Sequence, residues 1–173
     1  VFGLASCTDA AASVASAERQ VADGVKAMVG GQCSGETIAT LEKVGIPNGV
    51  LMISPSATSP ALSTIEDQGL FFRAAPSDAR QGEVIAELAN AQGIESIAIT
   101  YTNNDYGKGL ADSLKAAFEK LGGKVTISAA HDDGKADYSA EVAALAAAGG
   151  DALAVVGYVD QGGSGVTQGA LDT

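Results

Sequence analysis

The fold is decided by residues 96–130, which read SIAITYTNNDYGKGLADSLKAAFEKLGGKVTISAA. The segments 96–102 and 124–130 are nearly continuous apolar runs, which are typical of strands buried on both faces of a sheet. A helical stripe lies between them and is formed by Leu110, Leu114, Phe118 and Leu121. The glycine pair at 122–123 follows the stripe, as is common at a helix end. The order strand, helix, glycine, strand predicts a βαβ crossover and a parallel sheet.

The same rhythm extends over the rest of the chain. Further strand-like runs are Val1–Ser6, Val25–Gly30, Gly49–Ser54, Leu70–Ala74 and Asp151–Tyr158. Apolar helical faces between the runs are formed by Val14 and Val21, by Ile38, Leu41 and Val44, by Val84, Ile85 and Leu88, and by Val142 and Leu145. Glycines are predicted to end these helices at Gly24, Gly45, Gly93 and Gly149–Gly150. We therefore predict an α/β fold made of parallel-sheet βαβ layers.

One segment interrupts this rhythm. Residues 54–69 read SPSATSPALSTIEDQG and carry no clear helical stripe. The strand-like segment after them is followed by a proline and by Ser77 and Asp78, either of which can cap a new helix. We predict two lobes, residues 1–76 and 77–173. The alternative is one continuous sheet with a long loop.

Composition and charge exclude several classes of partner. The chain has 173 residues, of which 46% are hydrophobic and 18% charged, and this describes a globular domain rather than a disordered chain. Its formal net charge of −11 argues against binding to nucleic acid and against polybasic attachment to a membrane. No apolar run approaches the roughly 20 residues of a membrane-spanning helix. The chain begins with a strand-like run and stops within a helical pattern, so we expect it to be incomplete at both ends.

Polar residues that follow the predicted strands are the candidates for a functional site, because ligands of open parallel sheets bind beyond the carboxyl ends of the strands. They are Cys33, Ser34, Ser56, Ala57, Thr58, Asn103, Asn104, Asp105, Tyr106, His131, Asp132, Asp133 and Tyr158. The set offers hydroxyls, amides and two tyrosines. It holds few groups for acid–base or metal chemistry, since three adjacent residues at 131–133 cannot surround a metal. No phosphate-binding or dinucleotide-binding glycine motif occurs, and we predict no cofactor.

Cys33 has three interpretations. The pattern Gly31-x-Cys33-x-Gly35 can form a nucleophile elbow, in which case the single histidine, His131, would be the base of a cysteine hydrolase. A disulfide is better supported, because both cysteines lie at the ends of sequential strand-like runs, which should be neighbours in the sheet. Two buried free thiols are the third possibility.

The hydroxyl residues of the rim have both structural and ligand-binding interpretations. Ser34 precedes a predicted helix, where it can cap free backbone N–H groups or help to hold an anion at the positive helix end. Ser56, Ala57 and Thr58 can offer a backbone carbonyl and a hydroxyl to the ammonium and carboxylate of an amino acid. Tyr106 and Tyr158 are typical rim residues, with one apolar and one polar end.

Several segments together resemble one protein family. They are SCTDAAASVASAERQVADGVKAMVGGQCSGET, GVLMISPSATSP, LFFRAAPSDARQGEVIA, IAITYTNNDYGKGLADSLKAAFEKLGGKV and DYSAEVAALAAAGGDALAVVGY. In this order they resemble the periplasmic substrate-binding proteins of branched-chain amino acid transporters, the Leu/Ile/Val-binding family. The resemblance covers essentially the whole chain, although members of the family are about twice as long.

The resemblance implies a type I periplasmic binding protein, in which two lobes close about a hinge on an amino acid. It implies that Ser34, Ala57 and Thr58, with Ser56 as a further candidate, hold the ligand's carboxylate and amino groups. Tyr106 and Tyr158 would cover the ligand from the other lobe. The resemblance also implies a Cys7–Cys33 disulfide.

The implied function is non-catalytic capture of an amino acid, aliphatic or branched-chain, for the membrane permease of an ABC importer. The implied location is the periplasm, or an extracytoplasmic surface to which a lipid anchors the intact protein. No nucleic acid partner and no direct membrane insertion are expected. A ligand-sensing module of a receptor with the same fold is the alternative.

Overall fold

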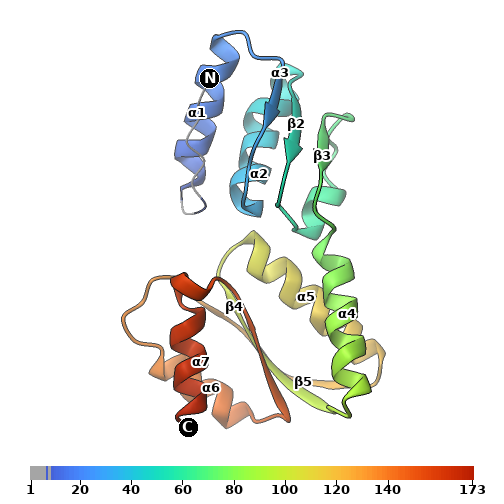
Figure 1. Cartoon of the computed structure of the whole chain (residues 1–173), viewed down its shortest axis with the longest axis vertical. Coiled ribbons are helices and arrows are strands. Elements are labelled where there is room, and N and C mark those ends of the chain that lie inside the picture. Colours follow the sequence, from blue (N-terminus) through green and yellow to red (C-terminus); the bar gives the residue numbers. More distant parts are fainter. Residues whose placement is uncertain (1–6, 8) are drawn as a thin grey trace. The chain divides into compact units, whose positions relative to one another are not determined.

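The computed structural model describes Cys7 and residues 9–173, so the predicted strand Val1–Ser6 lies outside the described residues. The chain divides into two compact units, Val1–Ser77 and Asp78–Thr173, which we call unit 1 and unit 2. Each unit contains its own three-stranded parallel sheet with helices packed on it (Figure 1). The predicted α/β class with parallel βαβ layers is confirmed.

Unit 1 is built on a sheet with the strand order β1-β2-β3. Its elements are α1 (Ala10–Ala22), β1 (Ala27–Val29), α2 (Ser34–Thr40), η1 (Leu41–Gly45), α3 (Ile46–Asn48), β2 (Leu51–Ser54), η2 (Pro60–Ser63) and β3 (Phe71–Arg73). The core lies between the sheet and the helical run that begins at Ser34. It consists of Leu41, Met52, Ala57, Leu62 and Phe71.

The opposite face of the unit 1 sheet carries apolar side chains that are exposed. Val29 pairs in register with Ile53, and Ile53 with Phe72, so the three form one row across the strands. Their exposed fractions are 82%, 37% and 55% respectively. From the apolar runs at β1, β2 and β3, the sequence predicts that these strands are buried on both faces. In the described part of unit 1 the prediction holds for one face only.

The helix after Ser34 is longer than the sequence predicts. It was expected to end at Gly45, but it passes through the π-helical turn η1, continues as α3 and ends at Gly49, which has a φ of 63°. Gly45 has another role, because a Cβ atom there would lie only 2.8 Å from the sulfur of Met52. This glycine lets the helix lie close to the sheet.

Unit 2 has a sheet with the order β5-β4-β6, whose strands span Lys124–His131, Ser96–Thr102 and Ala152–Val156. Its helices are α4 (Asp78–Ala91), α5 (Asp105–Lys120), α6 (Ser139–Ala148), η3 (Val159–Gln161) and α7 (Gly163–Leu171). Helices α4 and α5 cover one face of the sheet, and α6 and α7 cover the other (Figure 1).

The central strand β4 shows how the two faces of this sheet are filled. Ile97 and Ile99 belong to a buried cluster with residues of α4 and α5, whereas Ala98 belongs to a cluster with residues of α6 and α7. Side chains of a strand alternate between its faces, so a nearly continuous apolar run is what a strand covered on both sides requires.

The predicted contact face of α5 is confirmed except for Leu121, which follows the helix and is 45% exposed, and that of α4 is confirmed only for Ile85, which packs against the core. Leu110, Leu114 and Phe118 of α5 are buried. In α4, Val84 and Leu88 are exposed, and the buried residues are Asp78, Gly82 and Ala86. A Cβ atom on Gly82 would lie 2.6 Å from the backbone nitrogen of Leu114, so α4 and α5 meet through small residues.

Helix α1 also buries small residues. The sequence predicts that Val14 and Val21 share its inner face, but both are only half-buried. The buried side chains are Ser13, Ser16 and Ala17.

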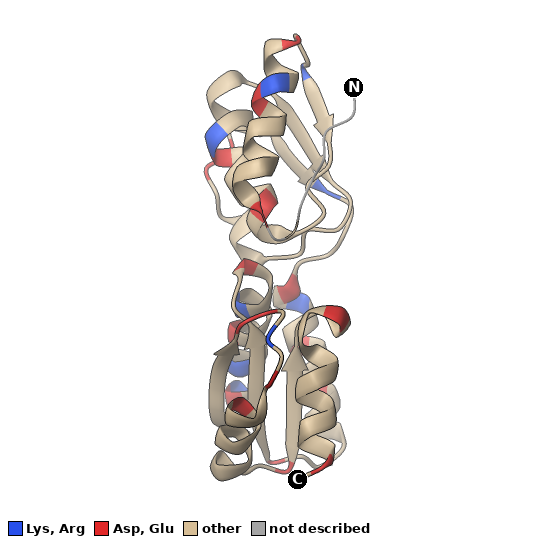
Figure 2. Ribbon diagram, turned by 90° about the vertical axis from the view of Figure 1, so that its left-hand side faces the viewer, with Lys and Arg blue, Asp and Glu red and all other residues tan. Residues whose placement is uncertain are grey.

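Charged residues are distributed over both units, with acidic and basic residues interspersed along the ribbon (Figure 2). Surface ion pairs such as Arg80–Glu83 and Lys108–Asp112 join neighbouring turns of helices. Within the described residues, none of the helices combines the length and the apolar character needed to cross a membrane.

Candidate functional site

Two loops follow β1 and β2 and lie side by side at the carboxyl ends of these strands. They comprise residues 30–34 and 55–59, and we call them the unit 1 rim. The Ser54 hydroxyl donates to the Gly31 carbonyl over 2.5 Å and accepts a bond from the Ala57 backbone N–H over 2.9 Å. The Ser56 hydroxyl donates to the Gln32 carbonyl over 2.8 Å. The predicted residues of the two loops are therefore brought together by direct hydrogen bonds.

Ser34 differs from the predicted helix cap. Cys33 is the N-cap residue of α2, and Ser34 is its first helical residue. The Ser34 side chain is buried, and its hydroxyl oxygen accepts a bond from the Ser59 backbone N–H over 3.0 Å. The proton of this hydroxyl has no acceptor among the described residues, so it remains able to donate to a ligand.

Glu36 is a residue that the sequence reasoning missed. Its Oε1 accepts bonds from the backbone N–H groups of Gln32 and Cys33 over 2.5 and 3.1 Å, and its Oε2 accepts from the Ser13 hydroxyl over 3.1 Å. The carboxylate thus binds the backbone N–H groups of the two residues that directly precede the helix, and not those of its first turn. An acidic residue three positions after the cap is a known helix-start signal, and this signal was available in the sequence.

Thr58 lies between two buried residues of the second loop, Ala57 and Ser59, and is itself half-buried. Within the described residues, neither its hydroxyl nor its backbone N–H has a hydrogen-bond partner. Ser56 is in a different situation, because its hydroxyl donates to Gln32 while its carbonyl accepts no hydrogen bond from the part of the chain that the structure describes. Thr58 is therefore the residue of this loop with the most unused hydrogen-bonding capacity.

Arg73, at the end of β3, supports the same loop and was also missed. Its guanidinium donates to the carbonyls of Ser59 over 2.8 Å and Ala57 over 3.4 Å, and to the Ser63 hydroxyl. These bonds tie the loop after β2 to the third strand. The carbonyls of Ala57 and Ser59, which accept bonds from this cation, are therefore less available to a ligand than the carbonyl of Ser56.

Unit 2 has its own rim, where the two predicted tyrosines meet. Tyr106 is near the start of α5, directly after β4, and Tyr158 follows the neighbouring strand β6. Their rings stack with centroids 5.3 Å apart. Burial raises the pKa of Tyr106, and the negative charge of Asp78 raises it further, so the phenol stays protonated and can donate a hydrogen bond at neutral pH.

His131 is a buried residue of unit 2. It is the last residue of β5 and has its Nδ1 2.8 Å from the hydroxyl oxygen of Thr100. Its ring meets that of Tyr138 edge to face. Burial lowers the pKa of His131, against the opposing influence of Asp133 and other acidic neighbours. The residue is packed into unit 2.

The predicted disulfide is confirmed. Cys7 and Cys33 are bonded, with Cα atoms 5.3 Å apart. The hydrolase alternative is thereby contradicted, because the chain has only these two cysteines and neither is a free thiol. Glu36 lies close to both sulfurs, but sulfurs that are bonded to each other do not serve as thiolate ligands for a metal.

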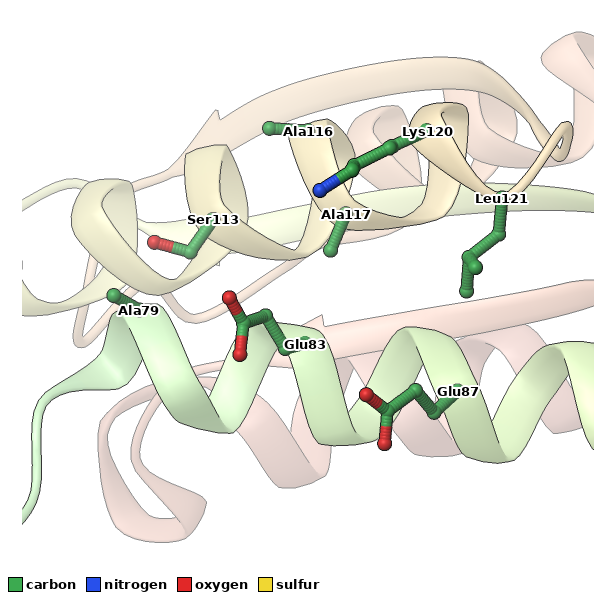
Figure 3. A pocket seen from close by; sticks show the side chains of 8 residues that line it. All are labelled: Ala79, Glu83, Glu87, Ser113, Ala116, Ala117, Lys120 and Leu121. Atoms are coloured by element: carbon green, nitrogen blue, oxygen red, sulfur yellow. The ribbon is translucent and has the colours of Figure 1, made fainter.

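A surface groove of about 480 Å³ lies between α4 and α5 of unit 2, away from the predicted residues (Figure 3). Glu83 and Glu87 line its α4 side, and the side chain of Lys120 extends from α5 (Figure 3). Arg80 pairs with both glutamates. The groove contains none of the candidate site residues.

Comparison with known proteins decides the family. Residues 3–160 match the protein family described as receptor family ligand binding region. The chain belongs to this family. Leu/Ile/Val-binding protein homolog 3 of Brucella melitensis is 37% identical over 158 residues, which are 87% of this chain and 40% of that protein. A leucine-, isoleucine-, valine-, threonine- and alanine-binding protein of Pseudomonas aeruginosa is 35% identical over 84% of this chain and 39% of its own length.

Solved structures of the same kind share the fold. A leucine binding protein from Thermotoga maritima superimposes with a TM-score of 0.80 at 25% identity, over 87% of this chain and 43% of that one. A branched-chain amino acid transporter substrate binding protein from Streptococcus pneumoniae, in complex with isoleucine, gives 0.72 at 27% identity, over 87% and 42%. The chain thus spans about two fifths of the length of these relatives. The resemblance inferred from the sequence is confirmed.

Proposed function

We propose that this chain is part of a solute-binding protein that captures an amino acid for an ABC importer. The units correspond in this proposal to the two predicted lobes, residues 1–76 and 77–173, which close on the ligand. The ligand is aliphatic or branched-chain and is not chemically changed. The observation that carries the proposal is the unused hydrogen-bonding capacity of Ser34 and Thr58 on one rim.

The unit 1 rim suits the charged groups of an amino acid. The hydroxyls of Ser34 and Thr58 and the Thr58 backbone N–H are donors for a carboxylate. The Ser56 carbonyl is an acceptor for an ammonium group, while the Ser56 hydroxyl is engaged within the protein. Ala57 holds the loop in place through its N–H bond to Ser54. Neutral donors and acceptors of this kind match a zwitterion better than a phosphate or another multiply charged anion.

The unit 2 rim suits an apolar side chain. The stacked rings of Tyr106 and Tyr158 present carbon surface that an aliphatic group can contact, and their hydroxyls remain polar. The two tyrosines cover the ligand in this proposal.

The proposal includes a periplasmic location and a permease as the partner. The Cys7–Cys33 disulfide supports an oxidising compartment outside the cytoplasm. The relatives are named as binding proteins, which supports a role without catalysis. The second candidate is a ligand-sensing module of a receptor, which the family's description favours. Import into vesicles that contain a permease distinguishes the two, because only the first candidate supplies a transporter.

Calorimetric titration with leucine, isoleucine, valine, alanine and phenylalanine tests the ligand class. We expect binding of at least one aliphatic amino acid, and we expect Thr58→Val to weaken it by about tenfold or more because a buried hydrogen bond is lost at constant side-chain shape. Ser34→Ala should weaken binding similarly. Thr64→Val, an exposed threonine that bonds locally to Ala61, is the matched control and should change affinity little. Absence of binding to all five, or no effect of Thr58→Val, would contradict the proposal.

A further inference from the structure

Glu36 is a buried carboxylate with no cation beside it. It is 2% exposed, and within the described residues no Lys, Arg or His lies within ion-pair distance of it. Burial of a charged group costs free energy unless hydrogen bonds replace its hydration. Here the replacement comes from the two backbone N–H groups and the Ser13 hydroxyl, together with the positive end of the helical run that starts at Ser34.

The two backbone groups that Glu36 binds directly precede Ser34. Carbonyls of the same segment are bound from other directions, because Ser54 donates to Gly31, and Ser56 to Gln32. The Cys33 carbonyl accepts from the backbone N–H and the hydroxyl of Thr37, over 3.1 and 2.8 Å. Glu36 is the one described side chain that holds the donor groups of this segment.

The position of Ser34 has an independent reporter. The Ser59 N–H donates to the Ser34 hydroxyl, and Ser59 lies 25 residues away on the other loop of the rim, where Glu36 makes no hydrogen bond. Any change that displaces the Ser34 side chain should therefore expose the Ser59 N–H to exchange with water.

We infer that Glu36 is a positioning residue, whose carboxylate fixes residues 32–33 and thereby holds the Ser34 hydroxyl in the ligand site. The inference rests on the proposed function for its ligand, but not for the geometry. Glu36 does not touch the ligand. It binds the backbone N–H groups of Gln32 and Cys33, the two residues that directly precede Ser34.

Amide hydrogen exchange of the full chain, followed by NMR, tests the geometry. Glu36→Ala removes both acceptor oxygens, and Glu36→Met removes them while keeping most of the side-chain volume. In both variants we expect the Ser59 N–H to exchange at least about tenfold faster than in the parent protein. Glu36→Gln keeps one oxygen for the two backbone donors. In this variant the exchange rate of the Ser59 N–H should stay within about threefold of that in the parent protein. Glu42→Ala changes an exposed glutamate of the same helical run and serves as the control.

Titration of the same variants with leucine tests the consequence. We expect about tenfold weaker binding in Glu36→Ala and Glu36→Met. In Glu36→Gln the affinity should lie within about threefold of that of the parent protein. If the parent protein binds no amino acid but the exchange results are as expected, the proposed function fails and the positioning role stands.

Three results would overturn the inference. One is unchanged exchange at Ser59 in a folded Glu36→Ala or Glu36→Met protein. Another is a Glu36→Gln protein that behaves like Glu36→Ala, since the charge rather than the acceptor geometry would then matter. The last is failure of both acceptor-free variants to fold, because Glu36 would then serve the fold as a whole and not Ser34 in particular.

Discussion

The rings of Tyr106 and Tyr158 stack with their centroids 5.3 Å apart and their planes inclined by 28°. The two residues are 52 positions apart in the chain and come from the ends of neighbouring strands, β4 and β6. The fold of unit 2 alone brings the two rings together.

The stacked pair should contribute to stability beyond the burial of each ring. A double-mutant cycle with Tyr106→Leu and Tyr158→Leu, measured by urea unfolding, should give a coupling free energy of about 0.5–1.5 kcal/mol. A parallel cycle of Tyr106→Leu with Tyr138→Leu is the control, because the ring of Tyr138 contacts His131 instead. Equal coupling in the two cycles would show that the stacking is not specific.

Stability should fall as the pH drops below about 6.5, the usual pKa of histidine. Burial lowers the pKa of His131 in the folded state, so the unfolded state takes up the proton first. The stabilisation is therefore present above this pH and is lost as the pH falls through the unfolded pKa. The free energy of unfolding should change by no more than about 1.4 kcal/mol per pH unit.

Urea unfolding between pH 7.5 and 5 measures this dependence. His131 is the single histidine of the chain, so His131→Asn should flatten the profile over this range. Asparagine keeps a polar group near the Thr100 hydroxyl. Parallel profiles for the parent and the variant would rule out His131 as the cause.

Reduction of the Cys7–Cys33 bond should destabilise the chain by about 3–4 kcal/mol, the value that loop-closure entropy gives for a separation of 26 residues. Urea unfolding with and without a dithiol reductant gives the difference. The double variant Cys7→Ala, Cys33→Ala should be insensitive to the reductant. A loss below about 1 kcal/mol would mean that native contacts already constrain this loop.

Gly82→Ala should destabilise unit 2 although alanine favours helices. The added Cβ would lie 2.6 Å from the Leu114 nitrogen and 2.7 Å from the Ser113 carbonyl carbon, and backbone atoms cannot rotate away. The strain of about 1–3 kcal/mol should exceed the gain in helix propensity of about 1 kcal/mol. Thermal unfolding should show a lower Tm for Gly82→Ala and little change for Gln81→Ala, an exposed position one residue earlier.

Sequence reasoning succeeded where a local pattern and the tertiary structure agree. The strand predicted at Ser96–Thr102 is β4 with identical bounds, because a strand covered on both faces needs apolar side chains at successive positions. The stripe of Leu110, Leu114 and Phe118 marked the buried face of α5 for the same reason. The meeting of Tyr106 and Tyr158 followed from the placement of strand ends at one edge of the sheet.

Prediction from the sequence failed where contact between distant segments decides the role of a residue. Small residues such as Gly82 define the buried face of α4, and hydropathy patterns do not detect them. Gly45 resembles a helix stop but serves close packing on Met52. Arg73 acquires its role from a loop that only the folded chain brings within reach.

The row of Val29, Ile53 and Phe72 has a practical consequence for experiments on the protein. A stripe of carbon surface adheres to chromatography resins and to apolar dyes, which can mask the small signals of ligand titrations. The row lies on the sheet face opposite the core, and none of its members belongs to the candidate site. Threonine at positions 29 and 72 would keep a residue that suits strands and make the surface wettable.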